Sequence, residues 1–355
     1  MTRTLLAATS AIALLALGAC GDGGAGGGAQ GARAGIWAAG SSTVFPFATR
    51  VAENFARTSG GAAPRVESLG TGGGIQAFCQ GVGPSTTDIA NASRPMKKSE
   101  FELCQKNGVT DIVELKVGFD GIVIATARTG NGFNFRLQDL YQGLAKEVPG
   151  ANGAFVANPA TSWNQVNPGL PNQRIQVYGP PPTSGTRDAF LELGMAPGGK
   201  LVPAVAAIES DKTQFETITH TLREDGAWID SGENDNAIVQ TLTRTPGSLG
   251  VFGYSFLEQN LDTVKAETID GIAPTLDTIA DGSYPLARSL YVYVKKAHIG
   301  VTPGLEGFIA EFMSDASAGR GGYLQDRGLV PLPADQLSAQ RAIASAKTNM
   351  TAPAK

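Results

Sequence analysis

The chain has 355 residues, of which 42% are hydrophobic and 17% charged, a composition typical of a globular protein with room for two domains. Its 28 basic and 32 acidic side chains give a formal net charge of -4 at pH 7. This balance argues against nucleic acid or an anionic membrane surface as a partner bound through bulk charge. An anionic ligand would have to be held by local groups.

The first residues have the pattern of an export signal. Arg3 is followed by the apolar run LLAATSAIALLALGA, which is too short to span a membrane, so we expect residues 1–19 to be a signal peptide. The run ends in LGAC, which resembles the lipobox of bacterial lipoproteins, and we therefore expect Cys20 to be lipidated. Cleavage by ordinary signal peptidase after the small residues is the alternative.

The next segment, residues 20–35, consists mostly of glycine and other small residues and is typical of a flexible tether. We expect the folded part to begin near Ile36. If Cys20 carries a lipid, Cys79 and Cys104 remain as an even pair, which favours a disulfide in an oxidising compartment. Two buried free thiols are the alternative.

Short apolar strands then alternate with helical patterns. The sequence predicts strands within residues 35–47, 64–70, 87–93 and 111–127, and helices at 48–60, 74–82 and 97–108. A second series contains a helix at 135–145 and a strand within 167–179, and helices at 302–316 and 335–347 close the chain. Alternation of strand and helix is typical of a parallel α/β fold, in which ligands bind beyond the carboxyl ends of the strands.

Four polar segments follow predicted strands, and three of them precede helices. They are GSSTVFP (40–46), GTGGG (70–74), NASRP (91–95) and TSGTRD (183–188). Each offers backbone N–H groups, hydroxyls or a guanidinium near a helix N-terminus, and together they have the composition of an anion site. Taken singly, the hydroxyls are typical of helix caps, and the arginines are typical of surface ion pairs.

The ordered motifs resemble those of the phosphate-binding proteins of bacterial Pst transporters. They are GSSTVFPF, GTGGGIQAF, DIANASRPMKKSE, VGFDGIVIA, SGTRDAF, ENDNAIVQTL and PGSLGVFGYSF. The similarity runs from about Ile36 to Val330. It implies the type II periplasmic-binding-protein fold, in which two α/β lobes are joined by two crossover strands. We expect lobe one to contain residues 36–121 and 289–345, and lobe two residues 122–288, with crossings at GIVIATA and PLARSLYVYV.

The resemblance also implies which residues bind phosphate. They are Ser42, Thr43, Val44 through its N–H, Thr71, Ser93, Arg94, Ser184, Gly185 and Thr186, with Arg187 close by and Asp120 as the acceptor of the ligand's proton. The chain departs from the family at two positions, since Pro180 stands where an arginine is common and Ser93 where an aspartate is common. We therefore expect Arg94 and Asp120 to supply the positive charge and the acceptor.

An acceptor carboxylate has a physical rationale of its own. Monohydrogen phosphate carries a proton that an ionised Asp120 can accept, whereas sulfate has none and would leave a desolvated carboxylate unpaired. The alternative for Asp120 is a structural role at the end of a strand. In TSGTRD, Arg187 either contacts the anion or is held beside it by a carboxylate, and the helix dipole stabilises Asp188.

The implied function is high-affinity binding of inorganic phosphate outside the cytoplasm and its delivery to a Pst-type ABC permease. We expect a monomer with no cofactor and no metal, attached to the membrane only by its lipid. A phosphate or phosphoester hydrolase, an envelope phosphate sensor and an envelope scaffold are the alternatives. Against a hydrolase, the chain has only His220 and His298, no HExxH motif and no GxSxG motif.

Overall fold

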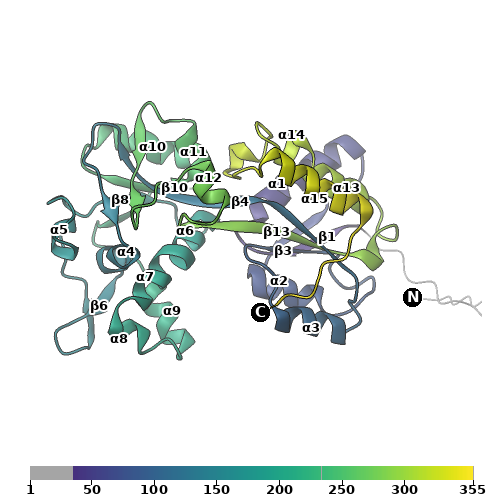
Figure 1. The fold of residues 1–355 in the computed structure, drawn as a ribbon, viewed down its shortest axis with the longest axis horizontal. Coiled ribbons are helices and arrows are strands. Elements are labelled where there is room, and N and C mark those ends of the chain that lie inside the picture. Colours follow the sequence, from purple (N-terminus) through teal and green to yellow (C-terminus); the bar gives the residue numbers. More distant parts are fainter. Residues whose placement is uncertain (1–34, 233, 355) are drawn as a thin grey trace, which may run out of the picture.

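The computed structural model describes residues 35–232 and 234–354, so the expected signal peptide and Cys20 lie outside the described residues. Two α/β lobes lie side by side and are joined by long strands, as the two lobes of Figure 1 show. Within the described part, no helix is both long enough and apolar enough to cross a membrane.

One sheet runs through both lobes in the order β2-β1-β3-β13-β4-β10-β8-β9, and β11 also pairs with β4. The strands in the first lobe are β1 (Trp37–Gly40), β2 (Arg65–Ser68), β3 (Ile89–Ala92) and β13 (Ala287–Lys295). The strand β4 (Ile112–Ala127) is shared by the lobes. Those in the second lobe are β8 (Val177–Gly179), β9 (Trp228–Asp230), β10 (Leu249–Gly253) and β11 (Val264–Ala266).

The strand β4 makes the principal connection between the lobes. It pairs antiparallel with β13 from Ile112 to Gly121, and with β10 from Ile122 to Ala125. β13 runs beside it and begins in register with Gly121. Both strands were expected as crossings, and the expected fold with two lobes joined by crossover strands is confirmed.

Helices cover both faces of the first-lobe sheet. One face carries α1 (Phe45–Ser59) and α13 (Leu305–Phe312), and the other α2 (Gly70–Phe78) and α3 (Lys98–Lys106). Cys79 and Cys104 form a disulfide that joins the ends of α2 and α3, so the predicted pairing is present. It lies in a small core with Phe78 and Tyr293.

The GTGGG segment differs from its prediction, because it forms the start of α2 rather than a loop. The reason is close packing of this helix on β1. A Cβ atom at Gly74 would lie 2.2 Å from the Cα atom of Gly40, so α2 can approach the strand this closely only with glycine there. As a result, Thr71 is presented from the first turn of a helix.

The second lobe contains short helices and two small additional sheets. Its remaining elements are β5 (Asn134–Phe135), α4 (Leu137–Leu144), β6 (Glu147–Pro149), β7 (Phe155–Ala157), α5 (Trp163–Val166), α6 (Gly185–Phe190), a π-helix (Leu191–Met195), α7 (Ala196–Lys200), α8 (Pro203–Ala206), α9 (Lys212–His220), α10 (Asp235–Arg244), α11 (Tyr254–Glu258), β12 (Thr268–Ile269) and α12 (Leu276–Ala280). β12 pairs with β5, and β6 pairs with β7.

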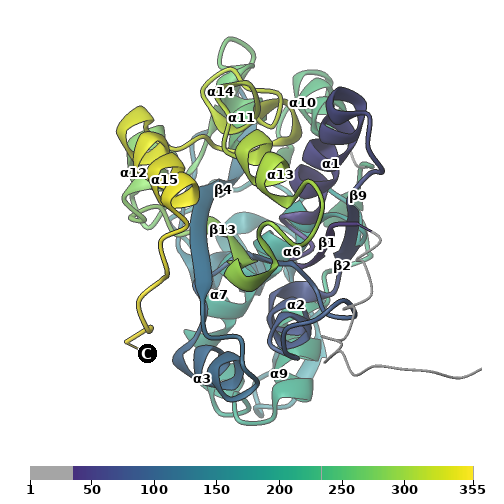
Figure 2. The same cartoon turned by 90° about the vertical axis from the view of Figure 1, so that its right-hand side faces the viewer.

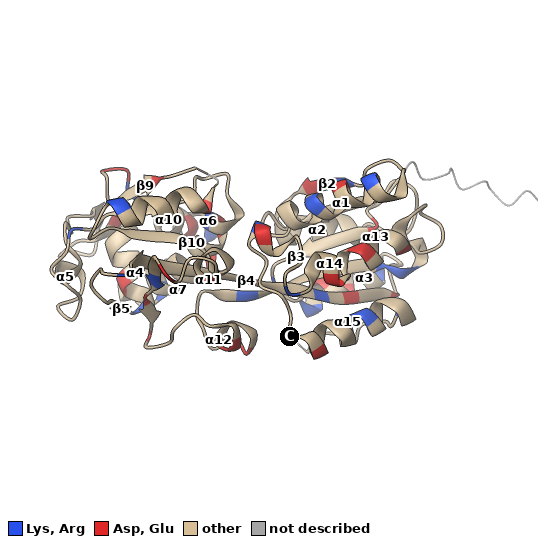
Figure 3. Cartoon of the chain, turned by 90° about the horizontal axis from the view of Figure 1, so that it is seen from above, with Lys and Arg blue, Asp and Glu red and all other residues tan. Residues whose placement is uncertain are grey.

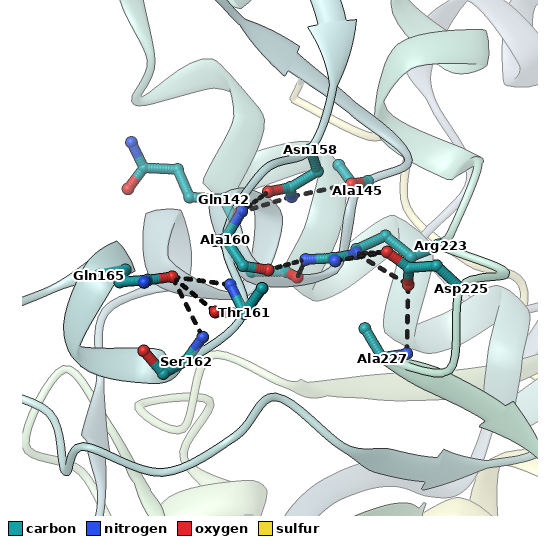
Figure 4. A network of polar contacts seen from close by, with 11 residues as sticks. Gln142, Ala145, Asn158, Ala160, Thr161, Ser162, Gln165, Arg223, Asp225 and Ala227 are labelled. Carbon is teal, nitrogen blue, oxygen red and sulfur yellow. Dashed lines mark hydrogen bonds and ion pairs between the residues drawn. The ribbon is translucent and has the colours of Figure 1, made fainter.

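A polar network fixes the approach to β9 in this lobe (Figure 4). The guanidinium of Arg223 donates to the carbonyl of Ala160 at 2.5 Å and pairs with Asp225. Asp225 in turn accepts from the N–H of Ala227, immediately before β9. The amide of Asn158 donates to two carbonyls at the end of α4. These contacts hold the strand that ends in Asp230.

The C-terminal part returns to the first lobe and covers the outer edge of β4 (Figure 2). Its elements are two 3-10 helices (Lys296–His298 and Gln325–Arg327), α14 (Asp315–Ala318) and α15 (Ala334–Ala346). Three contacts close the edge in turn: Met350 N–H donates to the Ile112 carbonyl, the Lys116 N–H donates to Gln340, and Phe119 bridges to Val330. The unpaired edge of β4 is thereby protected from pairing with another chain.

Charges of both signs are distributed over both lobes (Figure 3). Blue and red segments both occur on each lobe in this view, in agreement with the small net charge. Recognition of an anion therefore has to come from particular side chains and N–H groups in the fold.

One buried carboxyl group is poorly matched to its surroundings. Glu267 follows β11, and its side chain is buried. One carboxyl oxygen accepts from the N–H of Phe133, while the other has no hydrogen-bond partner. Burial raises the pKa of Glu267 from its ordinary value of 4.5 to about 7.

We predict that Glu267→Gln stabilises the protein above neutral pH. Because the folded pKa is raised, the stability contributed by the protonated carboxyl is fully present below about pH 4.5 and is lost as pH rises through about 7. At pH 8 the free energy of unfolding of the variant should exceed that of the parent by about 2 kcal/mol, with little difference at pH 5. Urea denaturation at both pH values measures this. The exposed Glu209→Gln is the control, and an equal effect at both pH values contradicts the assignment.

Candidate anion-binding site

The TSGT turn of the second lobe leads from β8 into α6. The N-cap of α6 is Ser184, whose side-chain oxygen accepts from the N–H of Thr186 at 3.2 Å. Ser184 is buried, and its own N–H donates to the carbonyl of Pro181. The expected strand, turn and helix are therefore present, with Ser184 in a capping role and with Gly185 and Thr186 in the first turn.

The GSST loop of the first lobe is also closely turned. The hydroxyl of Ser41 accepts from the N–H groups of Thr43 and Val44, at 3.2 and 3.4 Å. Gly185 lies directly against this loop, since a Cβ atom there would be 2.9 Å from the Cα atom of Thr43. The hydroxyl of Ser42 donates to Asp188 of α6 at 2.8 Å. The two loops, far apart in sequence, thus meet between the lobes.

Arg288 supplies the cation at this junction, and the sequence reasoning missed it. It lies on β13, in register with Asp120 on β4, and its side chain is 10% exposed. Its Nη2 donates to the hydroxyl of Thr43 at 2.6 Å, its Nη1 pairs with Glu192, and its Nε lies 3.4 Å from Asp120. The sequence feature that could have indicated Arg288 is the presence of an arginine inside the apolar segment PLARSLYVYV. The prediction for this segment was a crossing strand only.

Asp120 lies in the middle of β4 rather than in a strand-end turn. Burial raises the pKa of Asp120, and the neighbouring Arg288 opposes this effect. Two effects on the protonation of this carboxyl group therefore oppose each other: burial favours the protonated form, and the guanidinium favours the ionised form. A group in this position is suited to share a proton with a ligand.

Most of the expected ligand residues line two hollows between the lobes, whereas Val44 and Arg187 line neither. One, of about 480 Å³, is lined in part by Thr43, Asp120, Ser184, Gly185 and Thr186. The other, of about 550 Å³, is lined in part by Ser42, Thr71, Ser93, Arg94 and Arg288. Arg288 belongs to the second hollow and contacts Thr43 and Asp120 of the first, so it connects the two.

Residues of the second hollow are bonded to one another. The hydroxyl oxygens of Thr71 and Ser93 lie 3.0 Å apart, and Thr71 accepts from the Ser93 N–H at 3.1 Å. Arg94 makes two hydrogen bonds to Glu100, at 2.9 and 2.7 Å. Its guanidinium, expected to supply the positive charge, is thus matched by a carboxylate of its own lobe.

Arg187 is held beside the site, which is one of the two arrangements expected for it. Its guanidinium lies 2.5 Å from Asp230 and 5.2 Å from the ring centre of Trp228, and it also donates to the carbonyl of Pro180. The network in Figure 4 fixes the approach to the strand that carries Asp230. Arg187 therefore ties α6 to β9, and its charge is matched.

No group of metal-binding side chains occurs among residues 35–232 and 234–354. His298 is buried and bonded to Asp88, and His220 is bonded to Thr219. Neither histidine lines the two hollows.

Comparison with known proteins identifies the family. A family model described as the PBP superfamily domain matches residues 27–316. The chain belongs to the PBP superfamily. Within this superfamily it is similar to Protein SphX of Synechococcus elongatus, with 31% identity over 86% of this chain and 80% of that protein. It is also similar to the phosphate-binding protein PstS of Staphylococcus saprophyticus, with 31% identity over 85% of this chain and 82% of that protein.

A solved structure extends the comparison to the fold. The structure of a possible phosphate binding protein from Planctomyces limnophilus matches with a TM-score of 0.69 and 27% identity. The match covers 88% of this chain and 98% of that one. The resemblance to PstS-like proteins expected from the linked motifs is thereby confirmed.

The contact between the lobes predicts the effect of Gly185→Ala. The added methyl group would lie 2.9 Å from the Thr43 Cα atom and 3.1 Å from the Ser42 carbonyl oxygen, so the lobes would have to separate. We expect a larger radius of gyration in small-angle X-ray scattering. Gly132→Ala, with no atom within 4 Å of the added carbon, is the control. Identical scattering from Gly185→Ala and the parent would show that this contact does not hold the lobes together.

Proposed function

We propose that this protein binds inorganic phosphate outside the cytoplasm and delivers it to an ABC permease by closing its two lobes around the anion. The observation that carries the proposal is the contact of the TSGT loop with the GSST loop, whose Thr43 accepts a hydrogen bond from Arg288 beside Asp120. N–H groups, hydroxyls and a guanidinium from opposite lobes form a set of donors for a tetrahedral oxyanion. The similarity to the PstS of S. saprophyticus, named as phosphate-binding, supports the same ligand.

The residue roles follow from the geometry. In our proposal, Arg288 takes the charge-neutralising role in place of Arg94 and Arg187, whose guanidinium groups are matched by Glu100 and Asp230. Asp120 is the acceptor for the proton of the ligand. The donors are Ser42, Thr43, the N–H of Val44, Thr71, Ser93, Ser184, Gly185 and Thr186.

The movement that binds the ligand is a closure of two bodies about β4 and β13. The bodies are residues 36–121 with 289–345, and residues 122–288. Polar contacts between them include Ser42 with Asp188, Thr43 with Arg288, and Gln325 with Glu258. Two continuous strands that cross from one body to the other can act as the hinge of such a motion.

The PstS of S. saprophyticus is named as a binding protein, and we propose that this chain also binds its ligand without turnover. Neither histidine lines the hollows to act as a general base. We further propose that it acts as a monomer that needs neither metal nor cofactor, with Cys20 carrying the lipid that keeps it at the membrane. Intact-mass measurement of protein isolated from membranes tests the lipid.

Isothermal titration calorimetry with phosphate, arsenate, sulfate and a phosphonate tests the function. We expect tight binding of phosphate, and binding of sulfate weaker by about three decades because it leaves the acceptor carboxylate unpaired. Incubation with a phosphomonoester should release no phosphate. Absence of phosphate binding would overturn the proposal, and release of phosphate would favour a hydrolase.

We predict different effects for two arginine substitutions. Arg288→Gln removes the cation at the junction and should weaken phosphate binding by about 2 to 4 kcal/mol. Arg187→Gln removes a guanidinium already paired with Asp230 and should cost less than about 1 kcal/mol of binding. Calorimetric titration of both variants measures this, with thermal unfolding as the check on folding. If Arg187→Gln loses more phosphate binding free energy than Arg288→Gln, Arg187 and not Arg288 neutralises the charge of the anion.

The acceptor role of Asp120 predicts a change in selectivity. Asp120→Asn replaces the carboxylate by an amide whose N–H can donate to either anion, so the preference for phosphate over sulfate should fall by at least about tenfold. The ratio of the two dissociation constants is the measured quantity. An unchanged ratio would mean that discrimination arises elsewhere.

A further inference from the structure

The hydrogen bond between Ser42 and Asp188 decides whether the Ser42 hydroxyl can donate to an anion in the site. The Ser42 hydroxyl has one proton, and it is donated to the Asp188 carboxylate at 2.8 Å. Ser42 also lines the hollow that contains Arg288. An ionised Asp188 carboxylate can only accept hydrogen bonds. The single hydroxyl proton of Ser42 is therefore engaged by Asp188 and is not directed at a ligand. In this state Ser42 presents only lone pairs to an anion.

The charges around this pair are predominantly negative. Asp188 lies within electrostatic range of Glu192 on the π-helix, Arg288 on β13 and His220 at the end of α9. Arg288 in turn pairs with Asp120. Arg288 is shared among Asp120, Glu192 and Thr43. The adjacent Arg187 is paired with Asp230. The single guanidinium of Arg288 is thus shared among three carboxylates, those of Asp120, Glu192 and Asp188, before any anion arrives.

We propose that phosphate binding by this protein is coupled to uptake of a proton by Asp188, which reverses the hydrogen bond to Ser42 and makes Ser42 a donor to the anion. A proton from solvent adds to the Asp188 carboxylate, and the resulting O–H donates to the Ser42 oxygen. The Ser42 proton is then free to turn toward phosphate. The negative charge at the junction falls by one as the anion enters.

The environment of Asp188 supports this role. Burial raises the pKa of Asp188, and Glu192 acts in the same direction, while Ser42, Arg288 and His220 oppose it. A bound anion adds negative charge beside the carboxyl group and favours the proton further. Binding and protonation therefore strengthen each other, and phosphate affinity should fall as pH rises.

The inference rests on the proposed function and is tested with inorganic phosphate between pH 5 and 9. Calorimetry in buffers of different ionisation enthalpy counts the protons taken up. Between the pKa of Asp188 in the free protein and its higher pKa in the complex, the parent should take up as much as about one proton more than Asp188→Asn. In this range its affinity should fall up to about tenfold more per pH unit. The ionisation of phosphate itself contributes equally to both proteins. Asp262→Asn, at an exposed position of the same lobe, should behave like the parent.

A second variant keeps the test decisive if Asp188→Asn is poorly folded. Ser42→Ala removes the group that receives the proton of Asp188, so it should bind phosphate more weakly than the parent at pH 5 and show a flatter pH profile. Phosphate binding with the same proton count and pH profile in the parent and both variants overturns the inference and leaves the function intact. Absence of phosphate binding by the parent at every pH overturns the function itself.

Discussion

The guanidinium of Arg288 is the contact on which the geometry of the site depends. It leaves a crossover strand at the point where the lobes join, and its nitrogens reach a first-lobe loop, the neighbouring strand and the second lobe. A charge with low exposure at this place is stable only because each partner is an oxygen that accepts from it. The same contacts fix the position of Thr43 and Asp120. The arrangement thus combines structural support with recognition.

The other arginines near the site are paired with carboxylates of the protein. Arg94 with Glu100 and Arg187 with Asp230 are satisfied within their own lobes. These pairs orient α3 and α6 without adding net charge to the junction. Selectivity is therefore carried by hydrogen-bond donors and by one acceptor carboxylate more than by total charge, in agreement with the small net charge of the chain.

Local patterns were sufficient to predict an α/β protein, because alternating strands and amphipathic helices are specified by neighbouring residues. The arrangement in two lobes was implied by the resemblance of the linked motifs. The disulfide and the TSGT helix start were likewise predictable from short segments. The cationic centre was not predictable in this way, since Arg288 lies 168 residues after Asp120 and 245 residues after Thr43. Only strand pairing places Arg288 opposite Asp120. The GTGGG segment was assigned to a loop because the packing of Gly74 on Gly40 is a tertiary contact that composition does not reveal.

Both ends of the folded chain belong to the same body. The chain enters at β1, and its last residues run along β4 to a hydrogen bond between Met350 and Ile112 in the first lobe. A membrane attachment at one end and a reporter fused to the other would therefore travel together during closure. The second lobe would move relative to the first lobe, which carries both ends of the chain. A fluorescent label therefore has to be placed on the second lobe to detect the motion.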